Sequence, residues 1–210
     1  YAVDTAEMRR LIATADKIGW DFVRSSSALP ATVTAEVWQL LGNKTFVAHT
    51  STDKAVQAQL TFPEPGKITT DMQVSAWVKG SIVESRRAFF EKWFSNQLRV
   101  IHFDHSGSFG QPVEVAAKLD LSGMDTGNLY FYSYDKKTNR YTRIQEPDYL
   151  IDKNGYLHFT TELAGDIIVS DGPLVRKTPN IFFRSGPPFR NNVGPLCLFP
   201  FPSARSGHSG

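Results

Sequence analysis

Cysteine is almost missing from this sequence: the 210 residues include a single one, Cys197. One thiol cannot form a disulfide within the chain or a cysteine-based metal site. Low cysteine use also fits secreted proteins of Gram-positive bacteria, so we expect an extracellular or cell-surface location. No run of apolar residues approaches the roughly 20 that a spanning helix needs, and the sequence therefore predicts no membrane span.

Acidic residues are missing from one end of the chain. From Gly172 to Gly210 there is no Asp or Glu, while residues 1–171 hold 18 basic against 21 acidic side chains. A surface that follows nucleic-acid phosphates needs a basic excess, so we expect no nucleic-acid partner. Residues 174–210 also contain six prolines and no clear period. We expect 175–210 to lie outside the fold, either as a Pro-rich linker or as cloning-derived sequence.

Common catalytic motifs are missing as well. The chain has no G-x-S-x-G, no H-E-x-x-H and no glycine loop that could cradle phosphate. Four carboxylates could supply a glycoside-hydrolysing pair, but any β-protein with 21 acids offers such pairs by chance. They are Glu84, Glu91, Asp104 and Asp120. The sequence thus leans towards a non-catalytic protein, with no catalytic residue and no cofactor assigned.

The beginning of the chain has helical patterns. Residues 5–18 place apolar side chains at helical spacing and end at Gly19. A second short helix is predicted at 35–41, with Thr34 as its N-cap and Gly42 after its end. Residues 1–42 are therefore expected to form a helical lead-in.

After Gly42 the period changes to two, which predicts strands. Aromatic residues make up 12% of the chain and favour strands and recognition surfaces. Residues 84–96 could be a short helix or an irregular connection. We expect a mainly β protein: an antiparallel β-sandwich over 43–174, without βαβ units, between the helical lead-in and an irregular Pro-rich tail. The predicted strands are 54–62, 71–78, 98–103, 113–119, 128–134, 140–144, 156–161 and 166–170.

The order of motifs from about residue 29 to 174 resembles a recurring β-sandwich domain of Gram-positive, clostridial-type surface and secreted proteins. The matching segments are Trp77 to Gly80, Phe103 to Gly107, Leu129 to Asp135 and Asp152 to Tyr156. Ala164 to Ile167 departs from the usual final strand. The resemblance implies a neighbourhood of Ig-like repeats or polysaccharide-degrading enzymes, and it carries no catalytic residues.

A tyrosine stripe is the strongest candidate site. Tyr130, Tyr132 and Tyr134 share one face of a strand, while Leu129 and Phe131 face the core. Rings in such a row can stack on sugars, and nearby polar groups such as Asn128, Arg140, Arg143 and Gln145 can bind hydroxyls. The alternative is that the stripe packs against the N-terminal helix or the other sheet, or forms cross-strand pairs.

Further aromatic residues could extend this platform. Tyr141 lies across the hairpin, His158 flanks a core-facing leucine, and Trp77 is out of phase with its apolar neighbours. Trp77 could instead fill one end of the sandwich core. Trp20, Trp38 and Trp93 lie in or near helical stretches and are predicted to be packing residues. The predicted carbohydrate-binding set is Trp77, Tyr130, Tyr132, Tyr134, Tyr141 and His158.

Metal binding has weaker support. His102 and Asp104 share a face but His105 does not, so no metal site is predicted there. Asp120, Asp125 and Asp152 lie in turns, where a structural calcium is possible but ordinary turn chemistry is favoured.

Three functions therefore remain open. The first is an accessory module that binds polysaccharide or cell-wall glycan beside other modules of a parent protein. The second is a structural spacer or adhesion domain of a cell-surface protein. The third is a glycoside hydrolase.

Overall fold

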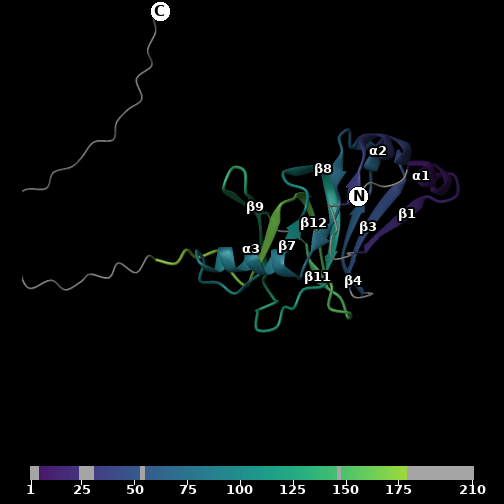
Figure 1. Ribbon diagram of the computed structural model, residues 1–210. Helices are drawn as coiled ribbons and strands as arrows, with labels where there is room; N and C mark the ends of the chain where they lie inside the picture. Colours follow the sequence, from purple (N-terminus) through teal and green to yellow (C-terminus); the bar gives the residue numbers. More distant parts are fainter. Residues whose placement is uncertain (1–4, 24–30, 53–54, 146–147, 179–210) are drawn as a thin grey trace, which may run out of the picture. The chain divides into compact units, whose positions relative to one another are not determined.

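The computed structural model describes residues 5–23, 31–52, 55–145 and 148–178 (Figure 1). Apart from 175–178, the predicted tail lies outside the described residues. The described part is mainly β, as the alternating patterns predict, and it contains three sheets. Within these ranges no helix is long and apolar enough to cross a membrane.

Two sheets make up most of the fold. The six-stranded sheet has the order β1-β3-β4-β8-β12-β11 and the five-stranded sheet the order β10-β9-β13-β7-β6, and all neighbours are antiparallel except β1 and β3. A small third sheet pairs β2 (Thr32–Val33) with β5 (Met72–Gln73). The first sheet comprises β1 (Lys17–Val23), β3 (Thr45–Thr52), β4 (Ala55–Phe62), β8 (Ser108–Ala117), β12 (Leu157–Leu163) and β11 (Leu150–Ile151). The second comprises β10 (Arg140–Ile144), β9 (Tyr130–Asp135), β13 (Asp166–Ser170), β7 (Leu98–Phe103) and β6 (Ala76–Trp77).

The inner faces of the two large sheets share one hydrophobic core. Phe131 of β9 lies 4.9 Å from Phe159 of β12, and Phe103 of β7 lies 5.5 Å from Phe109 of β8, measured between ring centroids. Strand alternation sends one set of side chains to this core and the other outward. The shared core is the arrangement expected of a sandwich.

The N-terminal region differs from the predicted helical lead-in. Helix α1 (Thr5–Ile12) ends well before residue 18, and Lys17 to Val23 forms strand β1. Ile18 fits both periods, because it follows Ala15 at helical spacing and alternates with Trp20. Burial of Ile18 in the core and pairing of β1 with β3 stabilise the strand over the helix.

Helix α2 (Ala35–Leu41) forms as predicted. The Thr34 hydroxyl accepts a hydrogen bond from Val37 N at 3.4 Å, and Gly42 ends the helix at φ 56°. Because β1 and β3 are parallel and α2 lies between them in the chain, this region is a βαβ unit. The expectation of no such unit is wrong, because the sequence pattern placed residues 17 and 18 at the end of a helix and predicted no strand over 19–23.

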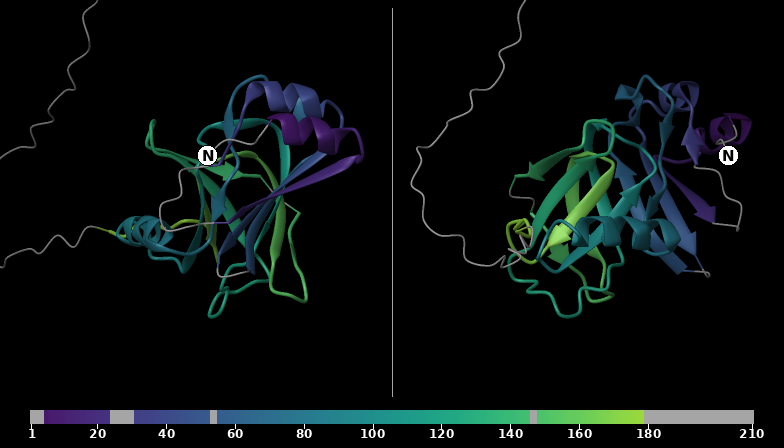
Figure 2. Two further views of the ribbon diagram at one scale, coloured as in Figure 1. Left: turned by 45° about the vertical axis from the view of Figure 1, so that its right-hand side comes forward. Right: turned by 60° about the vertical axis from the view of Figure 1, so that its left-hand side comes forward.

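Helices occupy two separate places in the fold. Figure 2 shows α1 and α2 side by side, with α3 (Ser81–Glu91) well away from them. Helix α3 and the residues after it supply Val83, Phe90 and Phe94 to a second hydrophobic cluster, with Leu98, Val100 and Ile168 from the five-stranded sheet. The ambiguous segment 84–96 therefore contains the end of a helix whose apolar side covers a sheet. A short 3-10 turn, η1 (Pro65–Lys67), follows β4.

Candidate functional site

The tyrosines of β9 lie on the outer face of the five-stranded sheet. Leu129 and Phe131 belong to the core between the sheets, which confirms the predicted division of faces. Tyr132 and Tyr134 belong instead to the cluster beneath α3. The candidate platform is thus on the predicted side of the strand.

Helix α3 covers this side over Tyr134. The Tyr134 ring is only 5% exposed and lies edge-on to Phe90 at 5.2 Å, while its hydroxyl donates to Asn139 Oδ1 at 3.1 Å. Tyr132 is half-buried, and its hydroxyl accepts a hydrogen bond from Leu174 N at 3.2 Å. The expectation of an open row of rings is therefore corrected. The cover is α3, not the N-terminal helix or the other sheet.

Tyr134 and Tyr141 form a cross-strand pair, which is one of the predicted alternatives. They are opposite each other in the register of β9 and β10, with ring centroids 4.8 Å apart. Tyr141 is less covered than Tyr134. Burial raises the pKa of the Tyr141 hydroxyl, so this group stays neutral and able to donate.

Trp77 is buried as well. Its side chain is 8% exposed and joins the cluster beneath α3, so it fills neither the inter-sheet core nor an open ligand surface. The indole Nε1 donates to Asp104 Oδ2 at 2.9 Å. This bond fixes both side chains at the end of β6 and β7.

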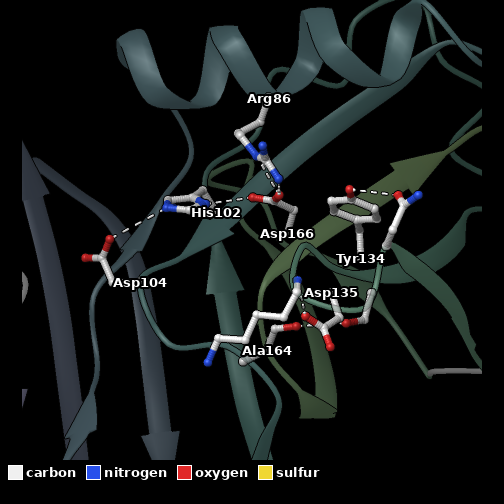
Figure 3. A network of polar contacts seen from close by, with 10 residues as sticks. Arg86, His102, Asp104, Tyr134, Asp135, Ala164 and Asp166 are labelled. Atoms are coloured by element: carbon white, nitrogen blue, oxygen red, sulfur yellow. Dashed lines mark hydrogen bonds and ion pairs between the residues drawn. The ribbon is translucent and has the colours of Figure 1, made fainter.

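A polar network runs beneath α3 (Figure 3). Asp166 of β13 accepts from Arg86 Nε at 2.6 Å and bonds His102 Nδ1 at 2.6 Å, and His102 Nε2 lies 3.6 Å from Asp104. Burial acts to raise the pKa of Asp166, but the hydrogen bonds with His102 and Arg86 outweigh it and hold that pKa below its usual value. The ion pair between Arg86 and Asp166 therefore anchors α3 to strand β13 of the sheet.

The sequence pattern indicated part of this network. His102 and Asp104 share a face as predicted, while His105 instead stacks on Phe109. Among the described residues, no group of three or more His, Cys, Asp or Glu could hold a metal ion. The sequence did not predict that Arg86 and Asp166 are partners. The available signal was an aspartate directly before three consecutive apolar residues of a buried strand, where a charge requires a partner.

An aromatic groove opens beside this cluster. It has a volume of about 400 Å³ and is lined by Phe89, Trp93, Phe94, Asn139, Tyr141 and Arg176. Trp93 is 54% exposed, although its place beside a helical stretch predicts a packing residue. Tryptophan is enriched at binding surfaces, so a solvent-exposed Trp93 beside other aromatic rings makes this groove a candidate binding site.

Residues after β13 complete one wall of the groove. Phe94 and Arg176 form an antiparallel bridge, with Ser95 N donating to Val175 O at 3.0 Å and Lys177 N donating to Trp93 O at 2.8 Å. Residues 175–177, which the sequence assigned to the tail, therefore pair with the chain that follows α3.

Tyr130 lies in a different hollow. The Arg143 guanidinium stacks over its ring at 4.9 Å, and Asn128 Nδ2 donates to its hydroxyl at 3.3 Å. The hollow has a volume of about 240 Å³. Two of the four polar residues expected beside the tyrosines, Asn128 and Arg143, are thus present at Tyr130.

His158 lies on the other sheet. It is on the outer face of the six-stranded sheet, in a groove of about 300 Å³, and its Nε2 lies 3.1 Å from Asp152 Oδ2. The six predicted residues therefore do not form one platform. Trp77, Tyr132 and Tyr134 are packed beneath α3, while Tyr141, Tyr130 and His158 line three different hollows. The hollows of Tyr130 and His158 adjoin, because Asp148 and Tyr149 line both.

The turn carboxylates show the predicted turn chemistry. Asp120, Asp125 and Asp152 each accept a backbone N–H from two residues further along the chain. Hydrogen bonds from the Tyr156 backbone and His158 hold the pKa of Asp152 below its usual value. These oxygens are directed at their own turns.

Comparisons with known proteins assign neither a family nor a function to this chain. No protein-family model matches the chain, and it has no significant match among curated proteins.

Proposed function

We propose that this chain is a non-catalytic carbohydrate-binding module of an extracellular or cell-surface bacterial protein, and that its groove beside α3 binds polysaccharide. The observation that carries the proposal is Trp93, a tryptophan 54% exposed at the edge of a groove that Tyr141 and Phe89 also line. We therefore assign sugar stacking to this groove and not to the row of Tyr130, Tyr132 and Tyr134.

The lining chemistry suits a sugar. Pyranose C–H faces are apolar and stack on aromatic rings, while their hydroxyls need polar partners. Trp93 and Phe89 supply rings, and Asn139 and Arg176 supply an amide and a guanidinium. Aromatic and polar groups at one groove are the combination that orients a small ligand.

The groove is preorganised, which favours affinity. Asn139 is fixed by the hydrogen bond from the Tyr134 hydroxyl, and α3 is anchored through Arg86 and Asp166. A ligand that binds such a site orders few side chains, so little conformational entropy is lost.

The carboxylates that could support hydrolysis are already engaged elsewhere. Glu84 and Glu91 pair with Arg87 on α3, Asp104 binds Trp77, and Asp120 accepts from Ser122 N. A glycosidase needs two carboxyl groups that face each other across the scissile bond. These contacts support binding over catalysis.

The extracellular setting is supported by the resemblance of segments between residues 29 and 174 to Gram-positive surface and secreted domains. A module in that setting has cell-wall glycan or polysaccharide as its ligand and further modules of a parent protein as neighbours. A glycan-binding groove fits this setting better than a spacer, which needs no exposed tryptophan.

The test is affinity electrophoresis in gels that contain soluble cellulose derivatives or xylan, with pull-down on insoluble peptidoglycan. Trp93→Ala should weaken the affinity measured from retardation about tenfold or more, because truncating a tryptophan that anchors a ligand costs over about 1.4 kcal/mol of binding. Ile82→Ala is the matched control, since Ile82 is exposed on α3 but does not line the groove.

Three results contradict the proposal. Absence of binding to every glycan favours the spacer or adhesion function. Binding that Trp93→Ala leaves unchanged rejects this groove as the site. Release of reducing ends from any of the polysaccharides favours the hydrolase instead.

A further inference from the structure

The outer face of the six-stranded sheet carries a second groove, built from side chains of neighbouring strands. Strand register puts Gln59, Ala116 and His158 in one row across β4, β8 and β12, with Thr61, Glu114 and Thr160 in the adjacent row. Because the side chain of Ala116 is small, it leaves a depression at the centre of the groove. Tyr149 and Leu150 line the groove beside β12, which gives it a volume of about 300 Å³, within the range of small-molecule sites.

Polar side chains of this groove are held in place by one another. His49 Nε2 lies 3.0 Å from Gln59 Oε1, and Gln59 Nε2 donates to Thr61 Oγ1 at 3.2 Å. The Tyr149 hydroxyl accepts from Leu129 N at 3.0 Å and donates to Thr126 O at 2.9 Å. The amide, the hydroxyls and the aromatic wall are therefore positioned before any ligand arrives.

Charge at the groove has one sign. Glu114 and Asp148 both line it, and within the described part of the chain neither carboxylate makes a hydrogen bond or an ion pair. Among the described residues that line the groove there is no Lys or Arg. Such a surface attracts cations.

We propose that this groove is a second binding site, and that it takes a glycan with free amino groups, such as a chain of unacetylated glucosamine. Gln59, Thr61 and Thr160 match the hydroxyls of a sugar, and the Tyr149 ring provides a wall for a sugar face. Glu114 and Asp148 match the ammonium groups. The site is on the other sheet from Trp93 and does not depend on the groove proposed there.

The test uses three tetrasaccharides that differ only at C2: a β-1,4-linked glucosamine tetramer, its fully N-acetylated form and cellotetraose. Isothermal titration calorimetry is done on the full chain at a pH where the amines are protonated. The glucosamine tetramer should bind about tenfold tighter than the other two, and its binding should weaken as salt rises.

Variants locate the site. Glu114→Gln combined with Asp148→Asn should weaken glucosamine-tetramer binding about tenfold, the sum of two exposed ion pairs at the upper end of their usual strength. Glu162→Gln is the matched control, because it removes an exposed acid of the same sheet that does not line the groove. Trp93→Ala should leave this binding unchanged, which separates the two sites.

Three outcomes overturn the proposal. Equal binding of the three tetramers shows that the amine is not recognised. Unchanged binding in the double variant places the ligand elsewhere. Binding of tetralysine as tight as that of the glucosamine tetramer shows a site for basic peptides and not for a glycan.

Discussion

Arg86 of α3 and Asp166 of β13 form a buried ion pair, with side chains 17% and 4% exposed. The guanidinium also lies 5.6 Å from the centre of the Phe89 ring and 5.6 Å from that of Tyr134. One side chain thus joins the helix, the sheet and the aromatic cluster. Since α3 also forms the groove with Trp93, this pair connects the stability of the fold to the candidate binding site.

Arg86→Ala should destabilise the protein by about 3 kcal/mol, because it removes the guanidinium that offsets the buried charge of Asp166 and leaves His102 as the remaining partner. Urea unfolding followed by circular dichroism measures the change. Arg87→Ala is the matched control: Arg87 is more exposed and pairs with Glu84 and Glu91 on the same helix, so its loss should cost under about 1 kcal/mol. Equal losses for both variants would show that the buried pair contributes no more than a surface pair.

Stability should depend on pH through Asp166. Its folded-state pKa is lowered, so the stability it contributes is complete above its unfolded pKa of about 4 and is lost as pH falls through the folded pKa. Asp166→Asn should be less stable than the native chain at pH 7, and the difference should shrink below about pH 4. Urea midpoints between pH 7 and about pH 2 measure this. A difference that stays constant over the range would contradict the assignment.

Tyr134 and Trp93 should give opposite results on alanine substitution. Tyr134→Ala removes a buried ring and should cost about 3 kcal/mol or more of unfolding free energy, seen as a lower melting temperature. Trp93→Ala should leave the melting temperature nearly unchanged and affect glycan binding only, because the ring is exposed. A stable Tyr134→Ala variant that loses binding would restore the tyrosine row as the site.

Local pattern predicted much of the sheet. Alternation in Ala55–Phe62 and Tyr130–Asp135 identified β4 and β9 and the correct core face of β9, because period two directly reflects which side is buried. Strand β3 (Thr45–Thr52) was not predicted, since buried residues on both faces weaken its alternation. The cap residues Thr34 and Gly42 correctly predicted both ends of α2.

The features that the sequence did not predict correctly depend on contacts between distant parts of the chain. Whether Tyr134 is open or covered is decided by α3, about 45 residues earlier in the chain, and no local pattern states which surface a helix covers. The pairing of Arg86 with Asp166 spans 80 residues. Trp93 was assigned to packing because it lies beside a helix, whereas its side chain faces solvent beside the bridge from Phe94 to Arg176.

Gly165, in the turn between β12 and β13, should tolerate no side chain. Its φ is +92°, and a Cβ there would lie 2.7 Å from the carbonyl oxygen of Tyr134, next to Asp166. Gly155 is the matched control, with φ +81° and nothing within 4 Å of the point that a Cβ would occupy. Both alanine variants carry the left-handed backbone cost of about 1 kcal/mol, but only Gly165→Ala adds a backbone clash. Urea unfolding should therefore show a clearly larger loss of stability for Gly165→Ala. Equal losses would mean that β9 and β13 can separate without cost at this turn, and that the position of Asp166 beneath α3 is less rigid than its contacts indicate.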